Sequence, residues 1–562
     1  MKTLPEFDLA GRSAARRGLL LGLLAAAVTP ARPGEAPPAR PGTAPDAPLL
    51  DGLDAYGFPV ASRDALARRY HQQGVMLVYG FNAAEAARSL EAAVARDPRC
   101  AACWWALAWS LGPNINTDMD AAAAARVDQA LRMARRHAAG ATPVQRGLID
   151  ALALRHPAPG QLNEEAYAEA LQALSRREPR DAEVAVLAAE ALMNLHPYDW
   201  WRADGRPQPW TPQIESLLRR AMALQPRHPG AHHYWIHLQE SSPHPERARA
   251  SADALRGAVP GSGHLLHMPS HIDLRTGRFE DAITANQRSI EADGRYLAQV
   301  DAQGAYRVGY VAHNHHFLWA AAAMTGQQAV ALQAAQAAWP AACGPAGRDP
   351  GGAIVQHYAV LPYFTRVRFG QWQALLRDTL PPDAPAPYPQ AMWHFAKGTA
   401  LARTGQRDAA RLELSALERI AADPALQGFR LKNINAAAQV TRIAVLTLQA
   451  ELAWAGGAPG AAAALLRQAT EVEDRLEYDE PHLWLAPTRH ALGAALLAAG
   501  EPAQAEQVYR EDLRHYPGNG WSLSGLALAL DRLGKAPDAK ASAQLAREAF
   551  ARAERMPAGS RF

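Results

Sequence analysis

Small and apolar residues recur at a fixed period near the C-terminal end of the chain. Residues 492–500 read Leu-Gly-Ala-Ala-Leu-Leu-Ala-Ala-Gly, and residues 526–534, which lie 34 positions further on, read Leu-Ala-Leu-Ala-Leu-Asp-Arg-Leu-Gly. Ala505 and Ala539 match at the same offset. Small residues where two helices cross, with glycine in the turn between them, are typical of stacked helical hairpins. The pattern therefore predicts a chain built from pairs of antiparallel helices.

Similar glycine turns recur upstream, at Gly277, Gly370 and Gly405, often at spacings longer than 34 residues. The predicted repeats are therefore irregular and carry insertions. A single hairpin cannot bury its apolar face alone, whereas stacked neighbours bury it jointly. We predict an all-α fold of the tetratricopeptide (TPR) type over residues 55–560, an α-solenoid whose hairpins form a right-handed superhelix with a concave surface.

The composition agrees with helices almost throughout, because the 562 residues are rich in Ala, Leu, Arg and Glu and contain few β-branched runs. Lys and Arg number 58 against 55 Asp and Glu, which gives a formal net charge of +3. This near balance excludes a strongly basic nucleic-acid-binding surface as the default. The sequence also has no Gly-x-x-x-x-Gly-Lys-Ser/Thr phosphate loop. We therefore expect no nucleic acid among the partners.

The first residues resemble an export signal. Arg16 and Arg17 precede an apolar run, residues 18–28, which is too short to span a bilayer and has the length of a signal-peptide core. The arginine pair resembles a twin-arginine signal, with an ordinary secretory signal as the alternative. We predict a cleaved signal peptide over residues 1–31, and hence a periplasmic or secreted protein with no membrane span in the mature chain.

The rest of the chain divides by composition. Residues 32–54 are Pro-rich and predict a disordered linker. Gly and Pro gather again around residues 344–352, which we interpret as a loop between two helical arrays. The predicted arrays are residues 55–343 and residues 353–562.

Histidines gather in the first array. Ten of the 20 histidines fall between residues 232 and 316, where an even spread would place about three. His233 and His237 are four residues apart, which puts both on one helical face, and Glu240 follows on that face. Intervals of three and four recur in two further segments, one with His264, His267 and His271 and one with His313 and His316.

Imidazole is the commonest neutral metal ligand in proteins, and a nearby carboxylate offsets the charge of a bound cation. So many titratable rings inside an Ala-rich bundle would be costly without partners. We predict a buried multi-histidine site for a transition metal (Zn, Cu or Fe), with Glu240 as a candidate general base. The predicted metal ligands are His233, His237, Glu240, His264, His267, His271, His313 and His316.

Six other histidines have a simpler interpretation. A single histidine on a helix is more often a core or surface residue than a ligand. The histidines that lie off the shared faces or beside prolines, and those that are isolated, fall in this class: His232, His244, His315, His357, His394 and His482.

Cys100 and Cys103 form a Cys-x-x-Cys motif, and Cys343 is the third cysteine of the chain. Three cysteines are too few for a scaffold built on disulfides. In an exported protein the motif is a disulfide, a pair of metal ligands or a redox pair. Alternatively, Cys103 is a small core residue at the start of a helix. The sequence leaves these alternatives open.

These motifs together resemble those of a family of bacterial TPR-repeat proteins. The resemblance rests on Cys-x-x-Cys-Trp, His-x-x-x-His, Gly-His-x-x-His-Met-Pro-x-His and His-Asn-x-His-Phe, and it covers nearly all of the mature chain. It implies the TPR fold and no settled reaction. The matching segments are residues 100–104, 111–116, 233–237, 263–277, 313–317 and 477–481.

Three functions follow as hypotheses. A metal-binding solenoid would act as a metalloenzyme, hydrolytic with a hard or borderline ion and oxidative with copper or iron. A non-catalytic scaffold would bind a peptide or protein partner in its concave groove, and its histidines would be structural. A thiol protein would use Cys100 and Cys103.

Overall fold

The computed structural model describes residues 47–562, except residues 55, 203, 303, 345–351, 380–385, 433 and 485. The predicted signal peptide, residues 1–31, and most of the predicted linker lie outside these residues. In the described part of the chain, two short strands are the only elements that are not helical.

Contacts divide the chain into two units, Met1–Ile272 with Arg288–Ala302, and Asp273–Gln287 with Gln303–Phe562. We had expected the division at the loop over residues 344–352. The helices on either side of that loop, α16 (Gln328–Cys343) and α17 (Ala353–Arg368), pack on each other, so both belong to the second unit.

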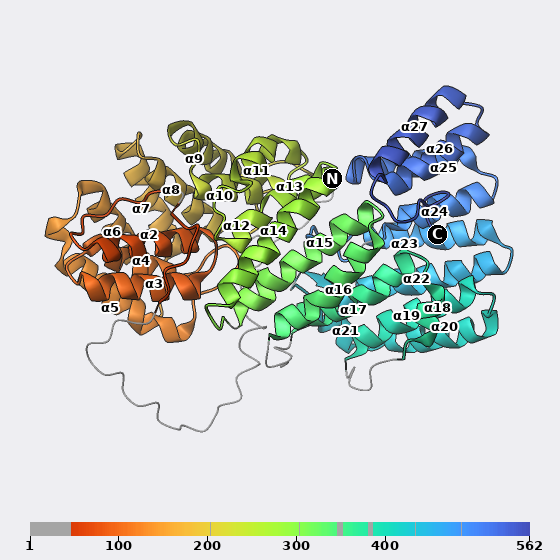
Figure 1. Cartoon of the computed structure of the whole chain (residues 1–562), viewed down its shortest axis with the longest axis horizontal. Helices are drawn as coiled ribbons and strands as arrows, with labels where there is room; N and C mark the ends of the chain where they lie inside the picture. Colours follow the sequence, from red (N-terminus) through yellow and green to blue (C-terminus); the bar gives the residue numbers. More distant parts are fainter. Residues whose placement is uncertain are drawn as a thin grey trace, which may run out of the picture. The chain divides into compact units, whose positions relative to one another are not determined.

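The first unit is a succession of helical hairpins in which each helix packs on its neighbour in sequence, as α2 does on α3 and α7 on α8 (Figure 1). Its helices are α2 (Ala65–Tyr79), α3 (Ala83–Arg96), α4 (Ala101–Ser110), α5 (Ala124–Arg136), α6 (Pro143–Arg155), α7 (Glu164–Arg177), α8 (Ala182–Leu195), α9 (Thr211–Leu224), α10 (Pro229–Glu240), α11 (Arg249–Leu255) and α12 (Gly263–His267). α13 (Pro269–Arg275) and α14 (Phe279–Leu297) contribute residues to both units.

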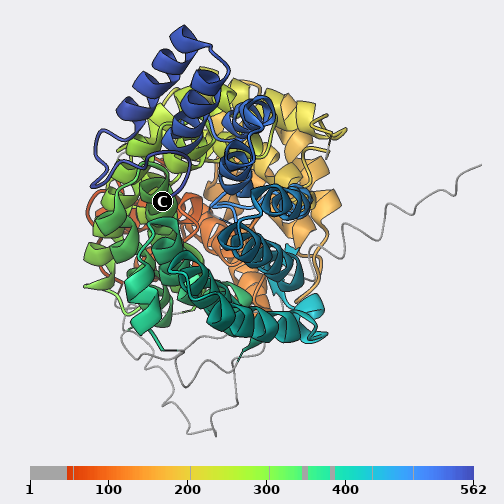
Figure 2. The same ribbon diagram turned by 90° about the vertical axis from the view of Figure 1, so that its right-hand side faces the viewer.

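The second unit repeats the arrangement, with α15 packed on α16, α19 on α20 and α26 on α27 (Figure 2). A two-stranded antiparallel hairpin, β1 (Arg430–Leu431) with β2 (Asn435–Ala436), interrupts it and pairs Arg430 with Ala436. The remaining helices are α15 (Ala312–Met324), α18 (Trp372–Arg377), α19 (Pro387–Arg403), α20 (Arg407–Ala421), α21 (Ala425–Gly428), α22 (Ala437–Ala455), α23 (Pro459–Glu473), α24 (Thr488–Ala498), α25 (Pro502–His515), α26 (Gly520–Arg532) and α27 (Ala536–Ala549).

The predicted repeat coincides with the hairpins of α24 with α25 and of α26 with α27. Gly500 and Gly534 have φ values of +77° and +73°, the left-handed conformation that the turn between the two helices requires. Gly493 and Gly525 face Tyr509 of α25 from either side, and a Cβ on either glycine would lie 2.3 or 2.2 Å from its ring. The prediction of an all-α, TPR-type α-solenoid is confirmed.

Two segments near the start of the first unit complete its packing. Residues 47–50, expected in the linker, lie against α2, where the Gln73 side chain donates to the Pro48 carbonyl at 2.9 Å and accepts from the Leu50 amide at 2.8 Å.

A disulfide joins Cys100 to Cys103 at the start of α4, and both cysteines are buried. Of the alternatives left open for this motif, the structure has the disulfide.

Among the described residues, no helix combines the length and the hydropathy that crossing a membrane would need.

Candidate metal centre

Two short helices, α10 and α12, carry His233, His237 and His264. Every residue of α10 is buried, so the helix runs through the interior and carries His233 and His237 one turn apart. α12 begins where the Ser262 hydroxyl accepts the Leu265 amide at 3.3 Å, which puts His264 in its first turn. A Cβ at Gly263 would lie 2.1 Å from the Asp293 carboxylate, so glycine lets α12 pack closely on α14.

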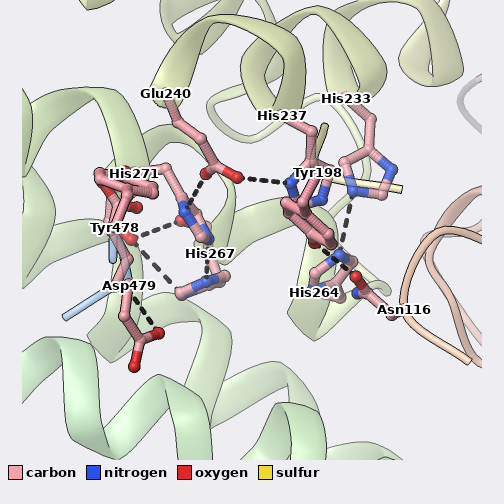
Figure 3. Close-up of polar contacts among 12 residues, drawn as sticks. Asn116, Tyr198, His233, His237, Glu240, His264, His267, His271, Tyr478 and Asp479 are labelled. Carbon is pink, nitrogen blue, oxygen red and sulfur yellow. Dashed lines mark hydrogen bonds and ion pairs between the residues drawn. The ribbon is translucent and has the colours of Figure 1, made fainter. Parts of the chain in front are cut away.

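His233, His237 and His264 form a triad of imidazoles (Figure 3). The Nε2 atoms of His233 and His264 are 3.0 Å apart, and the rings of His233 and His237 are 4.8 Å apart between centroids. One nitrogen of each ring lies within 4.8 Å of the other two. All three side chains are buried, with 3% or less exposed. The structure thus brings together three of the predicted ligands.

Glu240 clamps two imidazoles. Its Oε1 lies 3.0 Å from Nδ1 of His237, and its Oε2 contacts Nδ1 of His271 (Figure 3). With the proton of His237 on Nδ1, Nε2 of the same ring carries a lone pair. This Nε2 is buried and has no hydrogen-bond partner among the described residues. A histidine that binds a metal through one ring nitrogen usually donates the proton of its other nitrogen to a carboxylate, a carbonyl or water. The contact between His237 and Glu240 is of this kind.

A second pair of imidazoles lies beside the triad. Nε2 of His267 is 2.9 Å from Nε2 of His271, and both rings are buried. The His267 ring is 5.9 Å from the His264 ring, and the His271 ring is 5.7 Å from the His237 ring, between centroids. The first unit therefore gathers five of the seven predicted histidine ligands around one carboxylate.

Burial sets the charges of this cluster. Loss of solvent lowers the pKa of His233, His237 and His264 below the ordinary value for histidine, and neighbouring imidazoles lower the pKa of His233 and His264 further. Burial by itself would raise the pKa of Glu240, but His271 and His237 outweigh it and hold that pKa well below its usual range. Positive charge on the two rings nearest Glu240 is what favours its ionised form, and a bound cation would supply positive charge at the same place. Glu240 contacts two of the predicted histidine ligands and can therefore orient both, while its predicted roles as ligand and general base stay predictions.

Two aromatic residues in strained backbone conformations border the triad. Phe81 and Tyr198 have φ values of 54° and 55°, a region that bulky residues rarely adopt. The Phe81 ring lies 4.5 Å from His233 and stacks on His264 at 5.2 Å, and the Tyr198 ring meets His237 edge-on at 6.1 Å. Such strain persists where surrounding structure holds it, often at functional sites. No sequence motif predicts a role for Phe81 or Tyr198.

His313 and His316 lie on α15 in the second unit. The His316 ring packs against His357 of α17 at 5.4 Å between centroids, and Nδ1 of His357 lies 2.9 Å from the Tyr388 hydroxyl. Both ring nitrogens of His316 are buried without a hydrogen-bond partner in the described structure. His357, which the sequence indicates is isolated, thus forms a buried pair with His316. The two are 41 residues apart in the chain, so no local spacing predicts the contact.

Other histidines set aside from the sequence have ordinary partners. His232 bonds to the Ser251 hydroxyl at 3.0 Å and to the Pro226 carbonyl at 2.8 Å, so both ring nitrogens are satisfied inside the first unit. His394 lies 2.6 Å from the Glu413 carboxylate, and the exposed His244 lies 3.3 Å from Glu246.

Replacing His316 by leucine is expected to leave the free energy of unfolding unchanged or to raise it by up to about 2 kcal/mol. Two unpartnered buried nitrogens carry a desolvation cost that an apolar side chain of similar volume does not. Urea unfolding of His316→Leu measures the change. His232→Leu is the control, because it breaks two satisfied hydrogen bonds and should destabilise by about 1–3 kcal/mol. A comparable loss in His316→Leu would contradict the expectation.

Glu190 of α8 is a buried acid that the sequence analysis also missed. Burial raises its pKa to about 7, and its Oε1 accepts two long hydrogen bonds, from Trp109 and Asn194, both at 3.4 Å. Nothing in the sequence marked this glutamate, because its burial arises from the packing of α8 between α7 and α9.

Glu190 is expected to make the first unit less stable as pH rises. A folded pKa of about 7 against an ordinary 4.5 means that the native state binds the proton more tightly than the unfolded chain. The contribution of Glu190 is then full below pH 4.5 and falls by about 3 kcal/mol as the pH rises through 7. The buried histidines of the same unit have lowered pKa values and act in the opposite sense, so the difference in unfolding free energy between wild type and Glu190→Gln isolates the contribution of the acid. Urea unfolding at pH 4.5 and pH 8 should show this difference shrinking by about 3 kcal/mol at the higher pH. A difference that is the same at both pH values would refute the assignment.

Comparisons with known proteins add little to this geometry. No protein-family model and no curated protein matches the chain. Among solved structures, human IFIT1 in a dimer with m7Gppp-AAAA is 11% identical, with 87% of this chain and 91% of that chain covered and a TM-score of 0.29. Yeast Tom70 is 11% identical, with 84% and 90% covered and a TM-score of 0.26.

The complex of Cut9 with Hcn1 is also similar, at 13% identity, with 87% and 90% of the two chains covered and a TM-score of 0.25. At these identities and scores, the ligands and partners of these proteins do not carry over to this chain.

Proposed function

We propose that the first unit binds one transition-metal ion through the triad of His233, His237 and His264. The observation that carries this proposal is the buried, unpartnered Nε2 of His237, held toward the other two rings by the bond from its Nδ1 to Glu240. Three imidazole ligands leave a coordination position open, which is the arrangement of catalytic rather than structural zinc sites. Zn, Cu and Fe all suit imidazole nitrogen.

A metalloenzyme is the function that this arrangement supports best. A bound zinc ion would supply a water molecule of lowered pKa for hydrolysis, and copper or iron would supply oxidation chemistry. The chain itself contributes the dry enclosure: Phe81 stacks on the His264 ring, and the ring of Tyr198, whose hydroxyl bonds to the Asn116 side chain at 2.5 Å, lies edge-on to His237. Glu240 holds the tautomer of His237.

We further propose that the protein is exported and belongs to the bacterial TPR-repeat proteins that its motifs resemble. The apolar run behind Arg16 and Arg17 supports export. The Cys100–Cys103 disulfide agrees with an oxidising compartment.

Metal analysis of the full chain tests the proposed site. Protein purified from the periplasm should hold Zn, Cu or Fe, and apo protein should take up Zn²⁺ in a titration. His264→Ala should lose the triad ion. His232→Asn is the matched control, because this ring bonds elsewhere and should not affect binding. A folded wild-type chain that binds none of the three metals would refute the proposal.

The alternative function is a scaffold that binds a peptide or protein in the second unit. The observation that favours it is an open cavity of about 580 Å³ among α20, α22 and α23, lined by Glu418, Gln427, Gln439, Arg442 and Val472. Partner binding that survives both His264→Ala and removal of metal, but is lost in Arg442→Glu, would favour the scaffold.

A further inference from the structure

We propose that His267 and His271 hold a second metal ion beside the triad, and that Glu240 couples the two positions. The coupling rests, in addition, on the proposed triad ion.

The backbone stays helical between the two histidines, because Met268, which joins the two helices, has φ −51° and ψ −37°. α12 ends at His267 and α13 begins at Pro269, so His267 and His271 lie one turn apart across the junction of two short helices. Their Nε2 atoms approach to 2.9 Å, and only 0% and 6% of the two residues is exposed. An i, i+4 pair of imidazoles with facing Nε2 atoms is a chelating arrangement.

The protons of this pair are placed by their neighbours. A carboxylate oxygen of Glu240 contacts Nδ1 of His271 and can accept the proton of that nitrogen, which leaves a lone pair on Nε2 of His271. Nε2 of His267 lies 2.9 Å from this Nε2 and, in a neutral ring, can donate a proton to it. A cation that takes the place of this proton would be bound by both Nε2 atoms, with the His267 proton moved to Nδ1 or released.

Glu240 links the two positions chemically. One carboxylate oxygen orients His237 of the triad and the other orients His271 of the pair (Figure 3). The carboxylate thus contacts one proposed ligand of each position. Binding of the first ion would fix the Glu240 side chain and the tautomers of His237 and His271. The second ion would then bind with a smaller loss of conformational entropy.

The donor set indicates the class of metal. The proposed ligands of both positions are imidazole nitrogens, which suit late first-row transition metals such as zinc and copper and not Mg²⁺ or Ca²⁺, which require oxygen. We therefore infer a paired centre for two such ions.

Counting Zn²⁺ per chain tests this inference. Apo protein titrated with Zn²⁺ against a chromophoric competitor, and examined by native mass spectrometry, should bind two ions per chain. His267→Ala should bind one, because it removes a ligand of the pair and leaves Glu240 in place; His267→Gln repeats the test with less loss of volume. Glu240→Gln should weaken both ions by about 10–100-fold, and His232→Asn should still bind two.

The possible counts separate the two proposals. One ion in the wild type that is retained in His267→Ala and His267→Gln, but lost in His264→Ala, would refute the second position and leave the triad intact. One ion lost only in the His267 variants would refute the triad and support the pair. No ion in a folded wild type would refute both, and two ions of which only one responds to Glu240→Gln would refute the coupling.

Discussion

Replacing His264 by alanine is expected to weaken Zn²⁺ binding at the triad by roughly 70- to 900-fold. A structural zinc site with four ligands contributes about 10–16 kcal/mol, so one ligand accounts for about 2.5–4 kcal/mol. His264 supplies the nitrogen nearest to that of His233, at 3.0 Å. Competition titration of the full chain measures the change.

Glu240→Gln separates ligation from orientation in the same assay. An amide keeps the volume of the carboxylate but removes its charge, so the loss should be about 10–100-fold, smaller than that of His264→Ala. An equal or larger loss in Glu240→Gln would contradict the role of Glu240 as a clamp and return it to the set of ligands.

Trp521→Ala is expected to destabilise the second unit by about 3–5 kcal/mol. The indole is fully buried, its N–H donates to the Ala323 carbonyl at 3.1 Å, and Phe550 packs edge-on at 5.2 Å. The guanidinium of Arg368 lies over the Trp521 ring, 3.8 Å from its centroid. Truncation of Trp521 therefore also removes a cation–π contact and leaves a cavity beside a buried positive charge.

Hydrogen exchange of α26 in increasing urea reports this loss within the full chain. Trp393→Ala is the control, because Trp393 is only partly buried, with His394 packed edge-to-face against its ring and Lys397 Nζ over the ring at 5.7 Å from the centroid. This variant should cost about 1 kcal/mol or less. A similar loss in the two variants would show that the contacts of Trp521 are not what stabilises the unit.

Much of the fold was predictable because its signals are local. The positions of Gly500 and Gly534 follow from the need for left-handed backbone in a tight turn, and a period of 34 residues follows from the length of one hairpin. The grouping of His233 with His237 is equally local, since a helix places residues four apart on one face. These inferences need no knowledge of distant contacts.

Other features were not predictable from spacing. Glu240 was assigned as a ligand or general base because it shares a face with His237, yet its second oxygen contacts His271 from another helix. His357 was set aside as isolated, and only the packing of α15 near α17 brings it to His316. Phe81 and Tyr198 carry no ligand chemistry, so no motif could have marked them.

The sequence by itself determined the hairpin repeat, the all-helical fold and which residue types are available for metal chemistry, because turn geometry and helical periodicity act over a few residues. Only the tertiary structure decided which of those residues meet. It joined His264 to the α10 histidines, turned Glu240 into a shared clamp, and buried Glu190 deeply enough to raise its pKa to about 7. The physical reason is that proton positions, desolvation and the convergence of lone pairs depend on neighbours distant in the chain, which local patterns do not encode.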